Sequence, residues 1–404
     1  MSKAVTDKTP VNNVSILRLD QSDDTFSSMS VSIFFNRAPI IIVLSMVIAL
    51  LPGCEDSKPV RIGFIGELTT RAAGLATSGR DGFLLAIEEI NANGGINGQQ
   101  VEGLVADSRM HKETALQAIH KLAEGQVSAI IGPMTSQTAV SIVPTINSLK
   151  IPLISPTVST NELSGIDDYF FRVYYTNTQA AQLLSKHLID QEKPLHIAAI
   201  YDLSNSAYTE DWVEDFQDMF EKHTGSKVTR IPFDIRSNTL YLDLATRAVE
   251  ANPDGILLLA NAVDTAMICQ QLTKLRAEAT RYATGWSYSD DLIQFGGRSV
   301  EGLTIIQSAV LQDPSPAMRK FVNRYEKRFR TTPNFPAMHA YDATRMTLAV
   351  IQHGTDPEAI RQHLLDMESF RGLQSDLSVD RFGELKHPSL HLARISNGQF
   401  INAD

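Results

Sequence analysis

Ile131-Gly132-Pro133-Met134-Thr135-Ser136 is a short apolar run that stops at Gly and Pro and passes into small hydroxyl residues. The same pattern returns further along the chain, in Ile151-Pro152-Leu153-Ile154-Ser155-Pro156-Thr157-Val158-Ser159-Thr160. A buried strand of a parallel sheet ends in this way where a loop or helix begins. Because neighbouring parallel strands end at the same edge of a sheet, we expect the two hydroxyl-rich ends to share one crevice.

The residues after Ser136 predict a helix at the edge of that crevice. Apolar side chains recur at helical spacing between 139 and 146, so free N–H groups and a positive dipole end should face the loop. This favours an anionic ligand group, most simply a carboxylate. Judged from these residues alone, a structural role is favoured over ligand binding: Ser136 would only cap the helix, and residues 157–160 would only turn the chain. Pro144 predicts that this helix is kinked or starts late.

Strands alternate with helices along most of the chain. In the first unit, the predicted strands cover 60–66, 100–107 and 127–132, and the predicted helices cover 79–90 and 112–124. A second unit begins near Thr178 and repeats this build, with strands at 196–201, 227–233, 255–260 and 280–285. Such alternation indicates right-handed βαβ units. The sequence therefore predicts an α/β protein with two Rossmann-like parallel sheets flanked by helices, and a terminal hairpin that turns at Asn397-Gly398.

The composition and motifs argue against several functional classes. The net charge of −10 is unsuited to binding nucleic acid or an anionic membrane surface. The chain has no P-loop and no G-x-G-x-x-G, and the run at 285–289 ends in Ser where a nucleophile elbow needs Gly. His387 and His391 flank Pro388 instead of sharing a helix face, which argues against a zinc pair. We expect no enzymatic activity, no metal and no cofactor.

Residues 1–53 read as a signal peptide. Arg37 precedes an apolar run at 38–51 that is shorter than the about 20 residues of a stable membrane span. A start at Met29 would give a signal of ordinary length, which leaves open that residues 1–28 come from a mis-assigned start.

Leu51-Pro52-Gly53-Cys54 resembles the bacterial lipobox. This resemblance implies that the Cys54 thiol takes a lipid and that Cys54 becomes the mature N-terminus. Glu55-Asp56 resembles the inner-membrane retention signal of some bacteria. Cys269 is then the remaining thiol, so no internal disulfide is expected. Its apolar helical surroundings indicate a buried filler rather than a nucleophile.

At this point the chain resembles a known family. The opening from Gly63 to Gln99, with "AIEEINANGGINGQ", is similar to the opening of periplasmic binding proteins type 1 of the leucine/isoleucine/valine-binding group, the receptors of ABC importers. Further motifs follow in the order and spacing of that family: Ile131-Gly132-Pro133, Ile154-Ser155-Pro156, Phe171-Arg172, Ser206-Ala207-Tyr208, Glu301-Gly302-Leu303, Tyr341-Asp342-Ala343 and Asp380-Arg381-Phe382-Gly383-Glu384. The resemblance covers nearly all of residues 59–404.

The resemblance implies two lobes joined by a three-segment hinge, with the ligand cleft between them. We place the crossovers near Thr178, Ser308 and Arg371. Lobe 1 would then comprise 54–178 plus 308–371, and lobe 2 would comprise 179–307 plus 372–404. A ligand that touches both lobes only in the closed form favours closure, and an ABC permease would recognise that form.

Site residues follow from the resemblance one at a time. Ser136 matches the serine that contacts the ligand carboxylate. Thr157, Val158 and Ser159 match the segment that offers amides and a hydroxyl to the same group. Tyr208 matches the aromatic residue that covers the ligand from the second lobe.

Two positions depart from the family's pattern. Amino-acid binders of this group resemble one another in placing an acid near the position of Gly285 and often an aromatic residue near that of Asn261. A buried ammonium needs a partner charge. Asp264 or Glu67 could substitute for the missing acid, although each fits a solvated loop charge better, so a standard branched-chain amino acid is in doubt.

Two further residues are candidates for ligand contact. Trp286 offers a flat apolar or cation–π wall for an aromatic, quaternary-ammonium or amide ligand, and fits a core position of the second lobe equally well. Arg71, on a loop of the first lobe, could pair with a carboxylate or simply be solvated.

These observations lead to one function and one alternative. The first is a lipid-anchored extracytoplasmic receptor of an ABC importer, which binds a small amino-acid-like, carboxylate or amide ligand. The alternative is a sensing or scaffold lipoprotein of the same fold that acts on a signalling or cell-wall partner.

Overall fold

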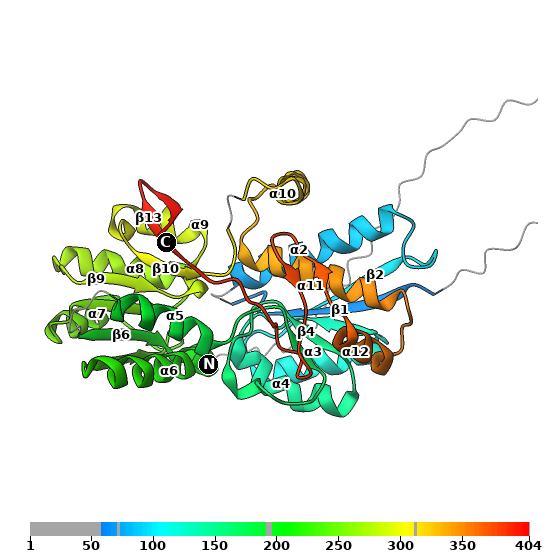
Figure 1. The fold of residues 1–404 in the computed structure, drawn as a ribbon, viewed down its shortest axis with the longest axis horizontal. Helices are drawn as coiled ribbons and strands as arrows, with labels where there is room; N and C mark the ends of the chain where they lie inside the picture. The colour runs from blue at the N-terminus through cyan, green and yellow to red at the C-terminus, as the bar shows by residue number, and fades with distance from the viewer. Residues whose placement is uncertain (1–57, 71–72, 191–195, 311–312, 404) are drawn as a thin grey trace, which may run out of the picture. The chain divides into compact units, whose positions relative to one another are not determined.

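Five parallel strands form the first sheet of the computed structural model, which describes residues 58–70, 73–190, 196–310 and 313–403. The strand order is β2-β1-β3-β4-β5. The bounds are β1 Val60–Gly66, β2 Val101–Asp107, β3 Ala129–Ile131, β4 Leu153–Ser155 and β5 Phe170–Arg172. Helices α2 Ala73–Ala92, α3 Lys112–Glu124 and α4 Ser136–Leu149 connect the first four strands (Figure 1). The expected βαβ alternation is confirmed.

The second sheet has the order β14-β13-β10-β9-β8-β6-β7. Its parallel strands are β6 Ile197–Asp202, β7 Val228–Phe233, β8 Gly255–Leu259, β9 Thr280–Ala283 and β10 Thr304–Gln307. The helices between them are α5 Asn177–Ile189, α6 Ser206–Thr224, α7 Tyr241–Glu250, α8 Ala262–Lys274 and α9 Asp290–Gly296. The terminal hairpin, β13 His391–Ser396 and β14 Gln399–Asn402, adds antiparallel to β10. The α/β class with two parallel sheets flanked by helices is thus confirmed.

Three later helices and a short strand pair complete the described fold. They are α10 Pro316–Phe329, α11 Phe335–Ile351, α12 Pro357–Asp366, β11 Phe370–Arg371 and β12 Asp376–Leu377. Helix α11 returns to the first sheet and lies against α2 (Figure 1). The two helices approach so closely that a Cβ at Gly82 would meet the Ala337 carbonyl oxygen at 2.1 Å. We call the first sheet with α2, α3, α4, α11 and α12 the first lobe, and the second sheet with its helices the second lobe.

Both faces of the first sheet are buried. Phe64 packs with the cluster that includes the α2 and α11 side chains, while its neighbour Ile65 packs with the α3 and α4 side chains. Alternate residues of a strand point to opposite faces, so a continuous apolar run such as 62–65 suits a sheet covered on both sides. The second sheet has its own core, which also takes in Tyr174 and Tyr175.

Several details differ from the sequence-based expectations. Helix α4 begins at Ser136 and continues through Pro144, so the alternative of a late start is wrong. Helix α2 begins at Ala73, earlier than expected, because buried Ala76 packs into the first-sheet core. The turn at 380–384 contacts the first sheet, where the Gly383 carbonyl accepts a bond from Arg172 N. The exact division between the lobes stays a prediction.

No helix among the described residues is long and apolar enough to cross a membrane. The expected signal peptide and Cys54 lie outside the described residues.

Candidate functional site

A small pocket lies where strands of both sheets end. Its cavity measures about 20 Å³. Residues from both lobes line it: Leu75, Met134, Ser136, Thr157, Ser159, Tyr174, Tyr175, Asn205, Tyr208, Trp286 and Phe335. Ser136 and Thr157 follow β3 and β4, and Trp286 follows β9. The pocket therefore occupies the carboxyl-end position at which open α/β sheets bind ligands.

The hydroxyl of Ser136 is the centre of the first-lobe wall. Its Oγ accepts hydrogen bonds from the backbone N–H groups of Ser159 and Thr160, each at 3.3 Å. A hydroxyl oxygen has two acceptor lone pairs and one proton. Two accepted bonds leave that proton for donation to another acceptor, and they polarise it. Ser136 is also the first residue of α4, so the positive end of the helix dipole lies at the same place.

Neighbouring hydroxyls hold the loop that carries these amides. The Ser155 Oγ accepts the Val158 N–H at 3.1 Å and donates to the Pro133 carbonyl at 2.9 Å. The Thr157 Oγ1 donates to the Met134 carbonyl at 2.7 Å. The side chain of Val158 is buried in the first-lobe core. The Ser155 and Thr157 hydroxyls thus connect the loops that follow β3 and β4. The two strand ends therefore lie together, as expected from the sequence.

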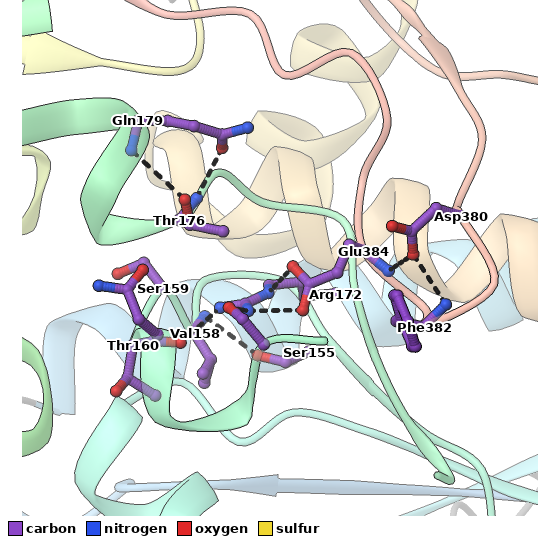
Figure 2. A network of polar contacts seen from close by, with 12 residues as sticks. Ser155, Val158, Ser159, Thr160, Arg172, Thr176, Gln179, Asp380, Phe382 and Glu384 are labelled. Atoms are coloured by element: carbon purple, nitrogen blue, oxygen red, sulfur yellow. Dashed lines mark hydrogen bonds and ion pairs between the residues drawn. The ribbon is translucent and has the colours of Figure 1, made fainter. Parts of the chain in front are cut away.

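A buried ion pair supports this loop from behind. Arg172, whose side chain is fully buried, makes two 2.7 Å bonds to the Glu384 carboxylate through Nε and Nη2. Its Nη1 donates to the Thr160 carbonyl at 2.8 Å. Figure 2 shows Arg172 between the 155–160 loop and the 380–384 turn, where Asp380 holds the backbone of Phe382 and Glu384. Such paired bonds fix a geometry as well as a charge.

The second-lobe wall is aromatic. Tyr208 meets Trp286 edge to face, with ring centroids 5.9 Å apart and planes at 89°. Tyr174 and Tyr175, from the segment that joins β5 to α5, stack at 4.1 Å and share a 3.1 Å hydrogen bond between their hydroxyls. Burial raises the pKa of Tyr174 to about 12, and it also raises the pKa values of Tyr175 and Tyr208 well above the ordinary value of a tyrosine. All three therefore remain neutral phenols at physiological pH.

Two amide side chains join the lobes beside the pocket. Asn205 Oδ1 accepts the Gln137 backbone N–H at 3.0 Å. In return, Gln137 Oε1 accepts from Ser206 Oγ at 2.9 Å and from Ala207 N at 3.2 Å. The starts of α4 and α6 therefore face each other at the pocket, and their positive dipole ends converge there.

The acidic residues considered as ammonium partners occupy other places. Glu67 is fully buried, accepts a 2.8 Å bond from Thr135 Oγ1, and has its pKa raised by burial. Asp264 is also buried, where it accepts bonds from Asn261 Nδ2 and from Tyr241 Oη at 2.6 Å. Neither acid is a solvated loop charge, and neither lines the pocket.

The structure brings together some of the expected site residues. Five of them line the pocket: Ser136, Thr157, Ser159, Tyr208 and Trp286. Val158 contributes an amide already bonded to Ser155. Asn261 caps α8 by accepting the Asp264 N–H, and neither of these two residues lines the pocket. Arg71 and Cys54 lie outside the described residues. Sequence reasoning missed Tyr174, Tyr175 and Asn205, because no spacing marks a pocket residue in a crossover or a short turn.

A larger cavity of about 290 Å³ shares Tyr174 and Tyr175 with this pocket. Segments that pass between the lobes line it, including Ser308, His339, Asp342 and Gln374. The Gln374 side chain bonds both the N–H and the carbonyl of Val310. We take the smaller pocket as the candidate site because the two Ser136-bonded amides and the starts of α4 and α6 lie at it.

Comparison with known proteins finds a matching family and several distant relatives. A family model described as periplasmic binding protein matches residues 59–399. The Leu/Ile/Val-binding protein homolog 3 of Brucella melitensis biotype 1 is 20% identical over 356 residues, which cover 85% of this chain and 94% of that protein.

Two solved structures show the same fold. A leucine-binding protein from Thermotoga maritima MSB8 has a TM-score of 0.78 at 22% identity, covering 85% of this chain and 98% of its own. A solute-binding protein of an ABC transporter from R. palustris, in complex with benzoate, has a TM-score of 0.77 at 15% identity, covering 85% of this chain and 95% of its own.

Proposed function

The chain belongs to the periplasmic binding protein family, and we propose that it is a lipid-anchored receptor that delivers a small carboxylate-bearing ligand to an ABC permease. The family consists of extracytoplasmic solute-binding proteins rather than enzymes, so the expectation of a non-enzymatic protein is confirmed. The partners that we propose are the ligand, the permease and the membrane that holds the lipid.

One observation carries the ligand proposal. The Ser136 hydroxyl accepts two loop amides at the start of α4 and lines the pocket. Its remaining proton and the converging helix starts favour a negative group at this end of the pocket. A carboxylate suits this position, as it would in an amino acid or in an aromatic acid. One similar protein is named for binding Leu, Ile and Val, and another was solved in complex with benzoate, so the ligands in these names are amino acids and an aromatic acid.

Binding requires the lobes to move. A cavity of about 20 Å³ holds about one water molecule, so a ligand enters only when the lobes part, and it then joins the Ser136 wall to the Tyr208 wall. Contact with both lobes makes the ligand favour a closed form, which a permease can distinguish from the open one.

The membrane anchor is a separate proposal from the sequence. Leu51-Pro52-Gly53-Cys54 supports lipidation at Cys54, and Glu55-Asp56 supports retention at the inner membrane.

A thermal-shift screen of the mature chain against amino acids, small carboxylates, amides, polyamines and aromatic acids tests the receptor function. A ligand at about one hundred times its Kd stabilises the folded state by about 2.7 kcal/mol. A hit must weaken in the Ser136→Ala/Tyr208→Ala variant, while Ser148→Ala, at the other end of α4, must bind as the wild type does. Unchanged affinity in the double variant would contradict the assigned site. Silence across the panel would favour the sensing or scaffold alternative.

A further inference from the structure

We infer that the pocket selects carboxylates with an apolar or aromatic body and no ammonium group, and that Tyr175 keeps an ammonium-binding acid out of it. This inference rests on the proposed receptor function and specifies its ligand class.

The charges around the pocket are the first argument. Its eleven described lining residues carry no carboxylate and no cationic side chain. An anionic group has donors at the Ser136 end, as described above. An ammonium has only neutral oxygens, and the amide oxygen of Asn205 already accepts the Gln137 N–H. A buried cation without a counter-charge is strongly disfavoured.

The two acids that the sequence offered as counter-charges, Glu67 and Asp264, are buried outside the pocket lining. Burial raises the pKa of Glu67, and its Oε1 is bonded to Thr135. Asp264 is held by Asn261 and Tyr241 at the start of α8. Glu67 Oε2 has no hydrogen-bond partner among the described residues, but neither Glu67 nor Asp264 lines the pocket. To reach a ligand ammonium there, either carboxylate would have to leave its buried position and the bonds that it makes.

Tyr175 occupies the place that an added acid would need. Gly285 follows β9 and precedes the pocket residue Trp286. A Cβ at Gly285 would meet Tyr175 Oη at 2.6 Å, and it would meet both Tyr174 Oη and the Ile306 carbonyl oxygen at 3.2 Å. Tyr175 is 1% exposed and is stacked on Tyr174, so it cannot swing aside without disturbing the second-lobe core. The Tyr175 hydroxyl is therefore the tightest obstacle to a side chain at position 285.

The remaining walls suit an apolar body. Leu75, Met134 and Phe335 line the pocket together with the Tyr208 and Trp286 rings. A cation over an aromatic face gains about 0.5–2 kcal/mol, which is less than the cost of stripping water from an unpaired charge. An uncharged hydrocarbon or ring gains free energy from burial without that cost.

Two matched ligand pairs test the inference by isothermal titration calorimetry. The first is leucine against 4-methylpentanoate, and the second is phenylalanine against 3-phenylpropanoate; each pair differs in the α-ammonium group. We expect at least one ammonium-free acid to bind at least tenfold more tightly than its amino acid. Equal or tighter binding of the amino acids would overturn the inference and leave the receptor function intact. Binding of neither pair would also overturn it, and the broader screen would then decide the receptor function independently.

A double variant tests the role of Tyr175. Tyr175→Phe removes the hydroxyl that meets Gly285, so Gly285→Asp combined with it should fold and should raise the affinity for leucine relative to 4-methylpentanoate at least tenfold. Gly285→Asp alone should melt at a lower temperature than the double variant. An unchanged ligand ratio in a folded double variant would contradict this role. If the double variant does not fold, the wild-type ligand pairs still decide the inference.

Discussion

Gln137 and Asn205 each cap a helix of the opposite lobe. The Asn205 side chain accepts the first-turn N–H of Gln137 in α4 at 3.0 Å, and the Gln137 side chain accepts the first-turn N–H of Ala207 in α6 at 3.2 Å. Neither helix is capped by the side chain of its own N-cap residue, Thr135 or Asn205. The free N–H groups at a helix start need partners, and here each lobe supplies the other's.

This reciprocal capping predicts that Gln137 stabilises the closed arrangement. Gln137→Ala removes the side-chain bonds to Ser206 and Ala207, each with a net value of about 1 kcal/mol. We expect the open form to gain population by roughly tenfold or more, seen as a larger radius of gyration in small-angle X-ray scattering. Gln217→Ala, which removes a bond to Glu221 within α6, should leave the radius unchanged. Equal radii for both variants would contradict the prediction.

The Arg172–Glu384 pair predicts a large loss of stability when one partner is removed. Glu384→Ala leaves the fully buried guanidinium without its counter-charge, which costs about 3–5 kcal/mol in urea unfolding. The control is Glu102→Ala, because the Arg61–Glu102 pair is 39% and 44% exposed and is worth at most about 1 kcal/mol. Similar losses in the two variants would show that burial does not set the strength of the pair.

The carboxyl of Asp342 predicts a stability that depends on pH. Burial raises its pKa from 3.8 to about 7. Between these values the unfolded chain loses the proton that the folded chain keeps, so the contribution of Asp342 to stability falls as pH rises through this range. Asp342→Asn cannot titrate, and its amide oxygen can still accept the Leu373 N–H. The variant should therefore gain stability over the wild type from pH 4 to 8, on the order of 4 kcal/mol.

His339 also makes the stability depend on pH, so the effect of Asp342 must be measured as the difference in stability between the wild type and Asp342→Asn. Burial lowers its pKa from 6.5 to about 4, so its contribution to stability is lost as pH falls through that range. This trend opposes that of Asp342 and partly hides it in the wild type. Because both proteins retain His339, thermal unfolding of each across the range isolates the carboxyl. A constant difference at all pH values would contradict the raised pKa of Asp342.

Trp286 should report ligand binding. The chain has two tryptophans, and Trp212 is fully buried against Phe216 in α6. In a Trp212→Phe variant, the emission comes from Trp286 beside Tyr208 alone. A ligand that enters the pocket should shift or quench that emission on saturation. No change at saturation, in a variant shown by calorimetry to bind, would place the ligand away from Trp286.

Cys54 should determine membrane attachment. Cys54→Ser removes the thiol that would take the lipid, so we expect the protein to leave the membrane fraction and to lose incorporation of labelled fatty acid. Cys269→Ala is the matched control, because Cys269 is buried in the second-lobe core, and it should stay labelled. Continued labelling of the Cys54→Ser protein would show that another group carries the lipid.

The sequence by itself determined the two sheets of parallel strands and the place on them where the candidate pocket lies. Apolar runs that end in Gly, Pro and hydroxyl residues marked β3 and β4, and Ser136 and Thr157 lie at one pocket because parallel strands end at one edge. The turn at Asn397-Gly398 predicted the terminal hairpin, since both residues adopt positive φ there. These are local patterns, in which the order of apolar and turn-forming residues over a short stretch indicates the secondary structure and the buried side of that stretch.

The tertiary structure alone decided how the two halves of the pocket meet. Gln137 and Asn205 are 68 residues apart, and no periodicity links them. The same holds for Tyr175 and Gly285, whose mutual fit appears only when the crossover segment lies against the second sheet. Glu67 and Asp264 resembled solvated loop charges in the sequence, yet the packing of other elements buries both. Hydrophobic periodicity indicates which side of a single helix or strand is buried. Which residue of the other lobe a side chain contacts depends on how distant helices and strands pack together.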